Sequence, residues 1–161
     1  MPDPQQFILG EFQRTLDERH RLSVPKELGD LLTADSAECV LAKERPGCLS
    51  LWNAEAWKGR FEEGVEWVKQ KMLKGKLDDQ MGDVQLLGRL LSTRHMQVQL
   101  AGRGRLLIPE GFREFLGVDR GGEVLVVGAA VCIEIWSPPQ WLEYLQRRMP
   151  KFRRLLEKLA T

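Results

Sequence analysis

The sequence has almost no excess of charge of either sign. Its 161 residues carry 24 Lys and Arg against 23 Asp and Glu, which leaves a formal net charge of +1. A chain this close to neutral has no global electrostatic attraction for nucleic acid. Any binding to nucleic acid therefore has to come from basic side chains that the fold places locally.

Residues that carry catalytic chemistry are also scarce. The only histidines are His20 and His95, and neither lies at a recognisable catalytic spacing from a nucleophile or a carboxylate. The stretch GRGR at 102–105 is too short for a phosphate-binding glycine loop and lacks its Lys and Ser/Thr. We therefore predict no catalytic residues, no metal site and no cofactor, and we expect that the protein is not an enzyme.

Cysteine is too sparse for a disulfide framework or a zinc site. Cys39, Cys48 and Cys132 are odd in number and none belongs to a CxxC pair. We expect them to be small buried hydrophobic residues in a reduced cytosolic protein. The N-terminus lacks a basic start followed by a long apolar run, so we expect neither a signal peptide nor a membrane span, which needs about 18 apolar residues.

What the sequence does contain is an internal duplication. A shift of 84 positions aligns residues 16–57 with residues 100–141 without a gap and gives 12 identities in 42 pairs. Chance would give about two or three at ordinary residue usage. Each copy begins with a turn-like segment that carries two arginines and leads to a proline: LDERHRLSVP at 16–25 and LAGRGRLLIP at 100–109.

Periodicity and turn residues predict the same order of elements in both copies. In the first copy we expect a strand, a turn, a second strand, a short helix and a hairpin, over residues 7–16, 17–20, 21–24, 25–32 and 39–52. Asn53 is predicted to cap the helix that follows. In the second copy, Ser137 and Gln140 are predicted to form a capping box, and Pro150 is expected to break or kink the last helix.

A strand, an Asp-x-x-x-Arg turn, a strand ending in Pro, a short helix and a hairpin, all present twice, resemble the MraZ family. These bacterial transcriptional regulators belong to the AbrB and MazE group of swapped-hairpin folds. Asp17, Arg21 and Pro25 match the family motif. The resemblance implies an α+β fold, a tandem swapped-hairpin β-barrel made of two repeats with flanking helices. The implied parts are a first SpoVT-AbrB-like repeat at 7–57, a helical connection at 58–94, a second such repeat at 95–141 and a helical tail at 142–161.

The two copies depart from the motif in different places. Ala101 replaces the aspartate in the second copy, whereas His20 replaces the usual glycine in the first. A glycine at that point indicates a positive φ angle, which histidine adopts only at some cost. Equal affinity of the two copies for DNA is therefore not expected.

Four arginines are the candidate DNA contacts. Guanidinium groups bridge phosphates or bind both acceptors of a guanine, and a two-stranded element fits the major groove. We expect Arg19, Arg21, Arg103 and Arg105 to form the contact surface and Asp17 to form the turn. Alternatively, the arginines pair with acids such as Asp17 and are purely structural. The paired tryptophans, Trp52 with Trp136 and Trp57 with Trp141, are expected to pack in the core rather than stack on bases.

The resemblance also implies partners. It implies double-stranded DNA at promoter repeats ahead of a division and cell-wall gene cluster, and self-assembly into a homo-oligomeric ring. It further implies opposition to a ribosomal RNA methyltransferase encoded beside the regulator, and a cytoplasmic, nucleoid-associated location. The competing hypothesis is a protein-interaction module, either antitoxin-like or inhibiting an enzyme, in which the arginines are structural.

Overall fold

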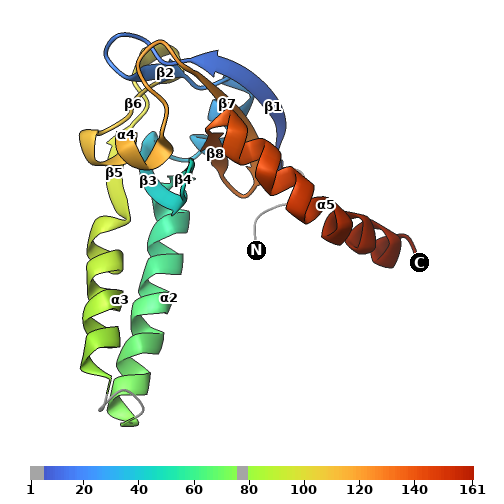
Figure 1. Ribbon diagram of the computed structural model, residues 1–161. Helices are drawn as coiled ribbons and strands as arrows, with labels where there is room; N and C mark the ends of the chain where they lie inside the picture. The colour runs from blue at the N-terminus through green and yellow to red at the C-terminus, as the bar shows by residue number, and fades with distance from the viewer. Residues whose placement is uncertain (1–5, 76–79) are drawn as a thin grey trace.

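The computed structural model describes residues 6–75 and 80–161, and its elements follow the order expected from the duplication (Figure 1). The first part contains β1 (Ile8–Thr15), β2 (Arg21–Ser23), α1 (Lys26–Leu32), β3 (Glu38–Arg45), β4 (Cys48–Asn53) and α2 (Ala54–Leu73). The second contains α3 (Met81–Thr93), β5 (His95–Gln99), the 3-10 turn η2 (Gly102–Gly104), β6 (Arg105–Leu107), α4 (Glu110–Leu116), β7 (Glu123–Ala130), β8 (Ile133–Trp136) and α5 (Pro138–Ala160). The expected mixture of helices and antiparallel strands is confirmed.

The strands of the two repeats interleave. Strands β1, β7, β8, β4, β3 and β5 form one antiparallel sheet in that order. The hairpins β3–β4 and β7–β8 meet through β4 and β8 at the centre, where Leu49 pairs with Ile135. Each repeat's leading strand pairs with the hairpin of the other repeat: β1 with β7 and β5 with β3. Neither repeat could therefore complete this sheet alone.

The sheet does not close on itself. Strands β1 and β5 are its two ends, and the remaining strands β2 and β6 pair separately as a short two-stranded ribbon. No closed barrel is found among the strands that the structure describes, in contrast to the barrel expected from the resemblance. Closure would need β1 and β5 to share a ladder, but each pairs along one edge only, β1 with β7 and β5 with β3.

One hydrophobic core takes side chains from both repeats. Equivalent positions both contribute to it, such as Leu22 with Leu106 and Leu51 with Ile135. The three cysteines are free and buried, as expected, and burial raises the pKa of Cys39 to about 11. Burial is also the main cause of the raised pKa of Cys48 and Cys132. Trp52 and Trp136 are buried as well, which confirms that this pair packs in the core.

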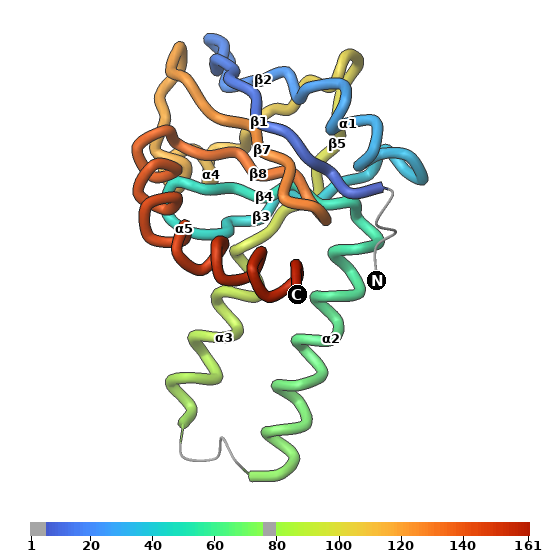
Figure 2. Tube along the Cα trace, turned by 90° about the vertical axis from the view of Figure 1, so that its right-hand side faces the viewer, coloured from blue at the N-terminus to red at the C-terminus, as the bar shows by residue number. Residues whose placement is uncertain are grey.

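Two helical parts extend away from the sheet. Helices α2 and α3 run side by side as a long hairpin, and α5 runs off in another direction (Figures 1 and 2). Asn53 caps α2 as predicted, because its side chain accepts hydrogen bonds from the backbone N–H groups of Glu55 and Ala56. None of the described helices is long and apolar enough to cross a membrane.

The start and the course of α5 differ from the prediction. Ser137 is the N-cap residue, but its side chain makes no capping hydrogen bond. The Ser137 backbone N–H, which a capping box would pair with the Gln140 side chain, donates instead to the carbonyl of Gly47 at 2.8 Å, and the Gln140 side chain packs over Gly47. Pro150 does not end the helix either. The carbonyl of Gln146, which loses its partner there, belongs to an exposed residue and can be hydrated.

A half-buried carboxyl in the sheet, that of Glu134, gives a pH-dependent stability. Burial raises the pKa of Glu134 above its ordinary value of 4.5, although the Trp136 indole N–H, 3.0 Å from Oε1, opposes the shift. As the pH rises from 4.5, the unfolded chain releases this proton first, so the folded state loses stability until its own raised pKa is passed.

Replacing Glu134 by glutamine should remove this loss, because glutamine keeps an acceptor for Trp136 and cannot ionise. We expect the stability of E134Q relative to the parent to increase with pH across that window and then level off. Urea unfolding at a series of pH values measures it. If the free energy of unfolding of E134Q differed from that of the parent by the same amount at every pH, the pKa of Glu134 would be the same in the folded and unfolded states.

Candidate nucleic-acid interface

The two arginine-bearing segments lie beside one another. Strands β2 and β6 pair antiparallel, with Arg21 opposite Leu107, Leu22 opposite Leu106, and Ser23 opposite Arg105. Segments 84 residues apart in sequence therefore form one ribbon. Arg21 and Arg105 begin their strands at opposite ends of it, about 7 Å apart along the strand direction at about 3.4 Å per residue.

The ribbon has a buried face and an exposed face. Leu22 is 2% exposed and Leu106 is fully buried, and both belong to the core. Because side chains alternate along a strand, their neighbours Arg21, Ser23, Arg105 and Leu107 share the opposite face. Leu107 is 51% exposed there, and Arg105 is exposed. The outer face of the ribbon thus presents two arginines on one diagonal, with Leu107 opposite Arg21 and Ser23 opposite Arg105.

Backbone hydrogen bonds repeat almost symmetrically at the two ends. The N–H of Val24 donates to the carbonyl of Gly104, and the N–H of Ile108 donates to that of His20, each over 2.9 Å. Val24 and Ile108 are equivalent in the duplication, as are His20 and Gly104. The turns also match. The backbone N–H of Asp17 donates to the carbonyl of Arg21, and the backbone N–H of Ala101 donates to the carbonyl of Arg105. The ribbon is therefore nearly two-fold symmetric in its backbone.

The first turn is held by Asp17. Its Oδ1 accepts the backbone N–H groups of Arg19 and Arg21 at 2.8 and 2.9 Å, and its Oδ2 accepts the Arg21 Nε at 3.0 Å. The backbone N–H of Arg21 is the main cause that lowers the pKa of Asp17. Asp17 forms the turn as expected, and Arg21 makes the ion pair that the structural hypothesis predicted.

The second turn has no such acid. Ala101 stands in place of the aspartate, and Gly102–Gly104 forms a 3-10 turn instead. Arg103 has a φ of 65°, a left-handed conformation that the sequence did not indicate. Within residues 6–75 and 80–161, no ion pair or side-chain hydrogen bond joins Arg103 or Arg105 to another residue. The guanidinium groups of the second turn are thus free to bind a partner.

The φ angle of His20 confirms what its position in the motif indicated. It is 58°, close to the 71° of Gly104 at the equivalent position. In addition, the buried Nδ1 of His20 has no hydrogen-bond partner among the described residues. The first copy therefore holds an unfavourable residue where the second has a glycine.

Replacing His20 by glycine should stabilise the fold by about 1 kcal/mol, because the positive φ costs glycine nothing. Replacing Gly104 by alanine should do the opposite. Its φ is already positive, and an added Cβ would lie 2.9 Å from the carbonyl oxygen of Val24. Urea denaturation midpoints of H20G and G104A test both. Equal midpoints for the two variants would contradict the equivalence of the two turns.

Two contributors to the interface were not predicted. Leu107 lies on its outer face, and strict alternation along the strand would have indicated this. Arg113 of α4 donates from Nε to the carbonyl of Ile108 at 2.8 Å and so holds the end of β6.

No group of three or more metal-ligating side chains occurs in the described part of the chain.

The chain is similar to known proteins over nearly its whole length. Residues 93–158 match the model of a family described as "MraZ protein, putative antitoxin-like". A protein of Alkaliphilus metalliredigens named transcriptional regulator MraZ is 31% identical over 142 residues, which are 86% of each chain. A protein of the same name from Heliobacterium modesticaldum is 28% identical over 95% of this chain and 96% of its own length. Another, from Thermus thermophilus, is 26% identical over 88% of this chain and 90% of its own length. The chain therefore belongs to the MraZ family.

Proposed function

We propose that the protein is a DNA-binding transcriptional regulator that contacts the duplex through the outer face of the β2–β6 ribbon. The relatives named transcriptional regulator MraZ support the general role. The observation that carries the proposal is the pairing of two arginine-bearing turns in one ribbon, with Arg21 and Arg105 on the exposed face. Arg105 is exposed on that face and makes no ion pair within the described residues.

The shape of the ribbon suits the major groove. A two-stranded ribbon is narrow enough to enter it, and arginine can bind guanine acceptors or phosphates there. Arg19 and Arg103 lie in the turns at the two ends of the ribbon, where they would reach the phosphates that flank the groove. The near two-fold symmetry of the backbone would match the symmetry of the duplex.

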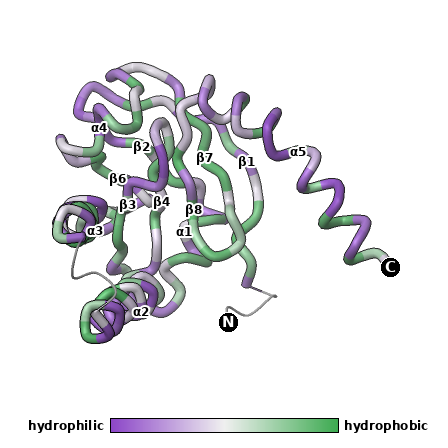
Figure 3. The backbone as a smooth tube through the Cα atoms, turned by 60° about the horizontal axis from the view of Figure 1, so that its bottom comes forward, coloured by the Kyte–Doolittle hydropathy of each residue, from purple (hydrophilic) through white to green (hydrophobic). Residues whose placement is uncertain are grey.

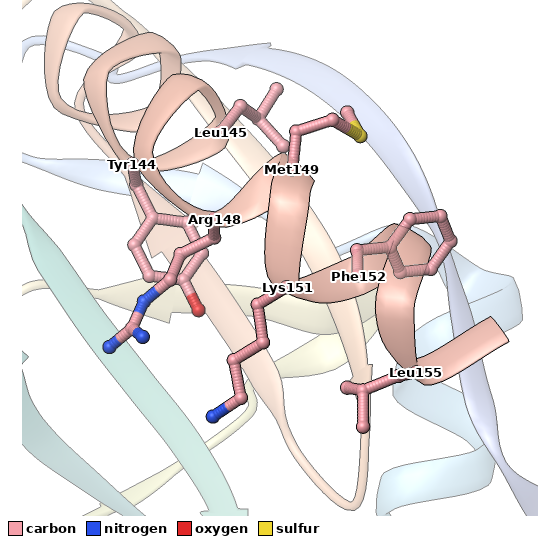
Figure 4. Close-up of a pocket in the computed structure, with 7 residues that line it drawn as sticks. All are labelled: Tyr144, Leu145, Arg148, Met149, Lys151, Phe152 and Leu155. Carbon is pink, nitrogen blue, oxygen red and sulfur yellow. The ribbon is translucent and has the colours of Figure 1, made fainter. Parts of the chain in front are cut away.

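A single ribbon would bind weakly, and we propose that self-assembly multiplies the contact. The helices that extend from the sheet expose large apolar side chains, among them Trp67 on α2 and Leu90 on α3. Figure 3 shows apolar and polar residues mixed along both helices. On α5, Met149, Phe152 and Leu155 are 45–54% exposed, beside the lysine and arginine side chains drawn in Figure 4. Covering these faces with further copies in a homo-oligomeric ring would place several ribbons along one duplex.

In the proposed organisation, residues 7–57 and 95–141 are the two repeats, 58–94 connect them and 142–161 are the tail. We propose repeated sequences in the promoter of the division and cell-wall gene cluster as the target. A ribosomal RNA methyltransferase is the proposed protein partner, and the nucleoid the proposed location.

The proposal is tested by replacing Arg21 and Arg105 together with alanine and measuring binding to that promoter DNA over a range of salt concentrations. We expect weaker binding and a smaller salt slope, because fewer counterions are released from the phosphates. Lys58→Ala, an exposed residue on α2 with the same kind of charge loss, is the control. Unchanged affinity and slope in the double variant would contradict the proposal.

A second candidate function is a protein-interaction module with structural arginines. The ion pair between Arg21 and Asp17 favours it in the first turn, and the description of the matching family as antitoxin-like agrees with it. Recovery of one stoichiometric protein partner, with no promoter DNA retained at physiological salt, would support this function over DNA binding.

A further inference from the structure

A cleft of about 290 Å³ lies where the α2–α3 hairpin meets the sheet, away from the β2–β6 ribbon. Aromatic rings form one wall of it. The ring centroids of Phe61 and His95 are 4.9 Å apart, those of Trp57 and His95 are 5.4 Å apart, and Trp52 continues the cluster. The volume suits a ligand of one or two rings and lies at the lower end of the range for small-molecule sites.

Two buried polar atoms in this wall have no partner. Trp57 Nε1 and His95 Nδ1 are covered, and neither makes a hydrogen bond to any described residue. Buried polar atoms are rarely left unpaired, and an indole N–H can only donate. A molecule in the cleft would satisfy Trp57 by offering an acceptor. Both atoms belong to side chains that line the cleft.

The duplication supplies an internal comparison. Trp141 is equivalent to Trp57, but its Nε1 donates to Glu11 Oε1 at 3.0 Å. Tyr144, at the position equivalent to Arg60, fills the second cluster, with its ring centroid 4.9 Å from Trp136 and 6.0 Å from Trp141. The second cluster is thus filled by Tyr144 and its indole donor is paired with Glu11 of β1, whereas the first cluster leaves an unpaired donor beside a cleft.

The charges around the cleft favour an anion. Arg94 donates from Nε to the carbonyl of Lys43 at 2.9 Å, which fixes its guanidinium at the wall, and Arg60 lies 4.6 Å over the Trp52 ring. Glu44 is the one acid that lines the cleft, and Ser50 Oγ donates to its Oε2 at 2.9 Å. Two guanidinium groups against one carboxylate leave the cleft positive.

We propose that this cleft binds a small planar aromatic anion, stacked on Trp57, Phe61 and His95, with an acceptor toward Trp57 Nε1 and its anionic group toward Arg60 and Arg94. A carboxylate and a phosphate share this chemistry. The site would give the regulator a small-molecule ligand, separate from the DNA contact.

Calorimetric titration of the full-length protein with indole-3-acetate and, separately, with AMP tests the proposal. The first probe carries a carboxylate and the second a phosphate, so the two titrations show which anionic group the cleft binds. Trp57→Phe keeps the ring but removes the donor, so we expect its dissociation constant for the bound probe to rise about tenfold. Arg60→Gln should also weaken binding of the same probe, because it removes a positive charge from the cleft. Trp141→Phe is the matched control and should leave binding unchanged.

Binding of either probe that weakens in W57F and R60Q but not in W141F supports the site and identifies the anionic group. Failure of both probes to bind at about 1 mM overturns the proposal, as does equal weakening in W57F and W141F. No DNA is present in these titrations, so neither result affects the proposed regulator function.

Discussion

Replacing Arg105 by glutamine is expected to weaken duplex DNA binding about tenfold or more and to reduce the salt slope by about one per contacting subunit. Arg105 is exposed on the outer face of the ribbon and makes no ion pair within the described residues, so all its donors are available to phosphates or bases. Arg21 occupies the equivalent position, but its Nε is already bonded to Asp17. The two copies of the turn should therefore contribute unequally.

The comparison needs a variant that leaves no unpaired carboxylate at the first turn. The double variant D17N/R21Q removes the ion pair without a change in net charge, and the asparagine side chain introduced by D17N keeps an acceptor for the backbone N–H groups of residues 19 and 21. We expect its affinity for promoter DNA to change by less than about threefold. Fluorescence anisotropy at several salt concentrations measures both variants. Equal losses in R105Q and D17N/R21Q would show that the ion pair does not reduce the contribution of Arg21.

Replacing Leu106 by alanine is expected to lower the free energy of unfolding by about 2–5 kcal/mol. Leu106 is fully buried and pairs with its repeat equivalent Leu22, so the cavity would open beneath the ribbon where the two repeats meet. Because the ribbon has only three residue pairs, its register depends on this buried face. L106A should therefore lose DNA affinity as well as stability.

Leu107→Ala is the matched control, since it shortens the same side chain one residue further on, where 51% is exposed. We expect it to cost less than about 1 kcal/mol. Urea unfolding followed by circular dichroism gives both values. A similar loss in the two variants would mean that the ribbon is not seated on the core through Leu106.

The duplication made much of the fold predictable from the sequence. Turn residues such as Pro46 and Gly47, and the N-cap Asn53, act on the backbone within a few residues of themselves, so they indicate local structure directly from the sequence. Pairing between strands is different, because it depends on the other repeat. Local patterns could not show that β1 pairs with β7, or that the sheet ends at β1 and β5 without closing. The predicted capping box at Ser137 was wrong, because the Ser137 N–H donates to the carbonyl of Gly47, a contact 90 residues away in the sequence.

The candidate site was predictable in its residues but not in its arrangement. The sequence identified Arg21 and Arg105, and the position of His20 in the motif correctly indicated a positive φ. It could not show that the two arginine turns share one ribbon, since that contact spans 84 residues. The left-handed φ of Arg103 was also hidden, because arginine rarely adopts that conformation and nothing nearby in the sequence requires it.

Photocrosslinking from the outer face of the ribbon tests the DNA contact most directly. A photoreactive phenylalanine analogue in place of Leu107 would lie opposite Arg21 and two residues from Arg105 on the same face. The same analogue in place of Trp67, 64% exposed on α2, would lie away from the ribbon. On promoter DNA we predict crosslinks from position 107 and none from position 67. Crosslinks from position 67 alone, with the 107 variant still binding DNA, would contradict the assignment of the interface to the β2–β6 ribbon.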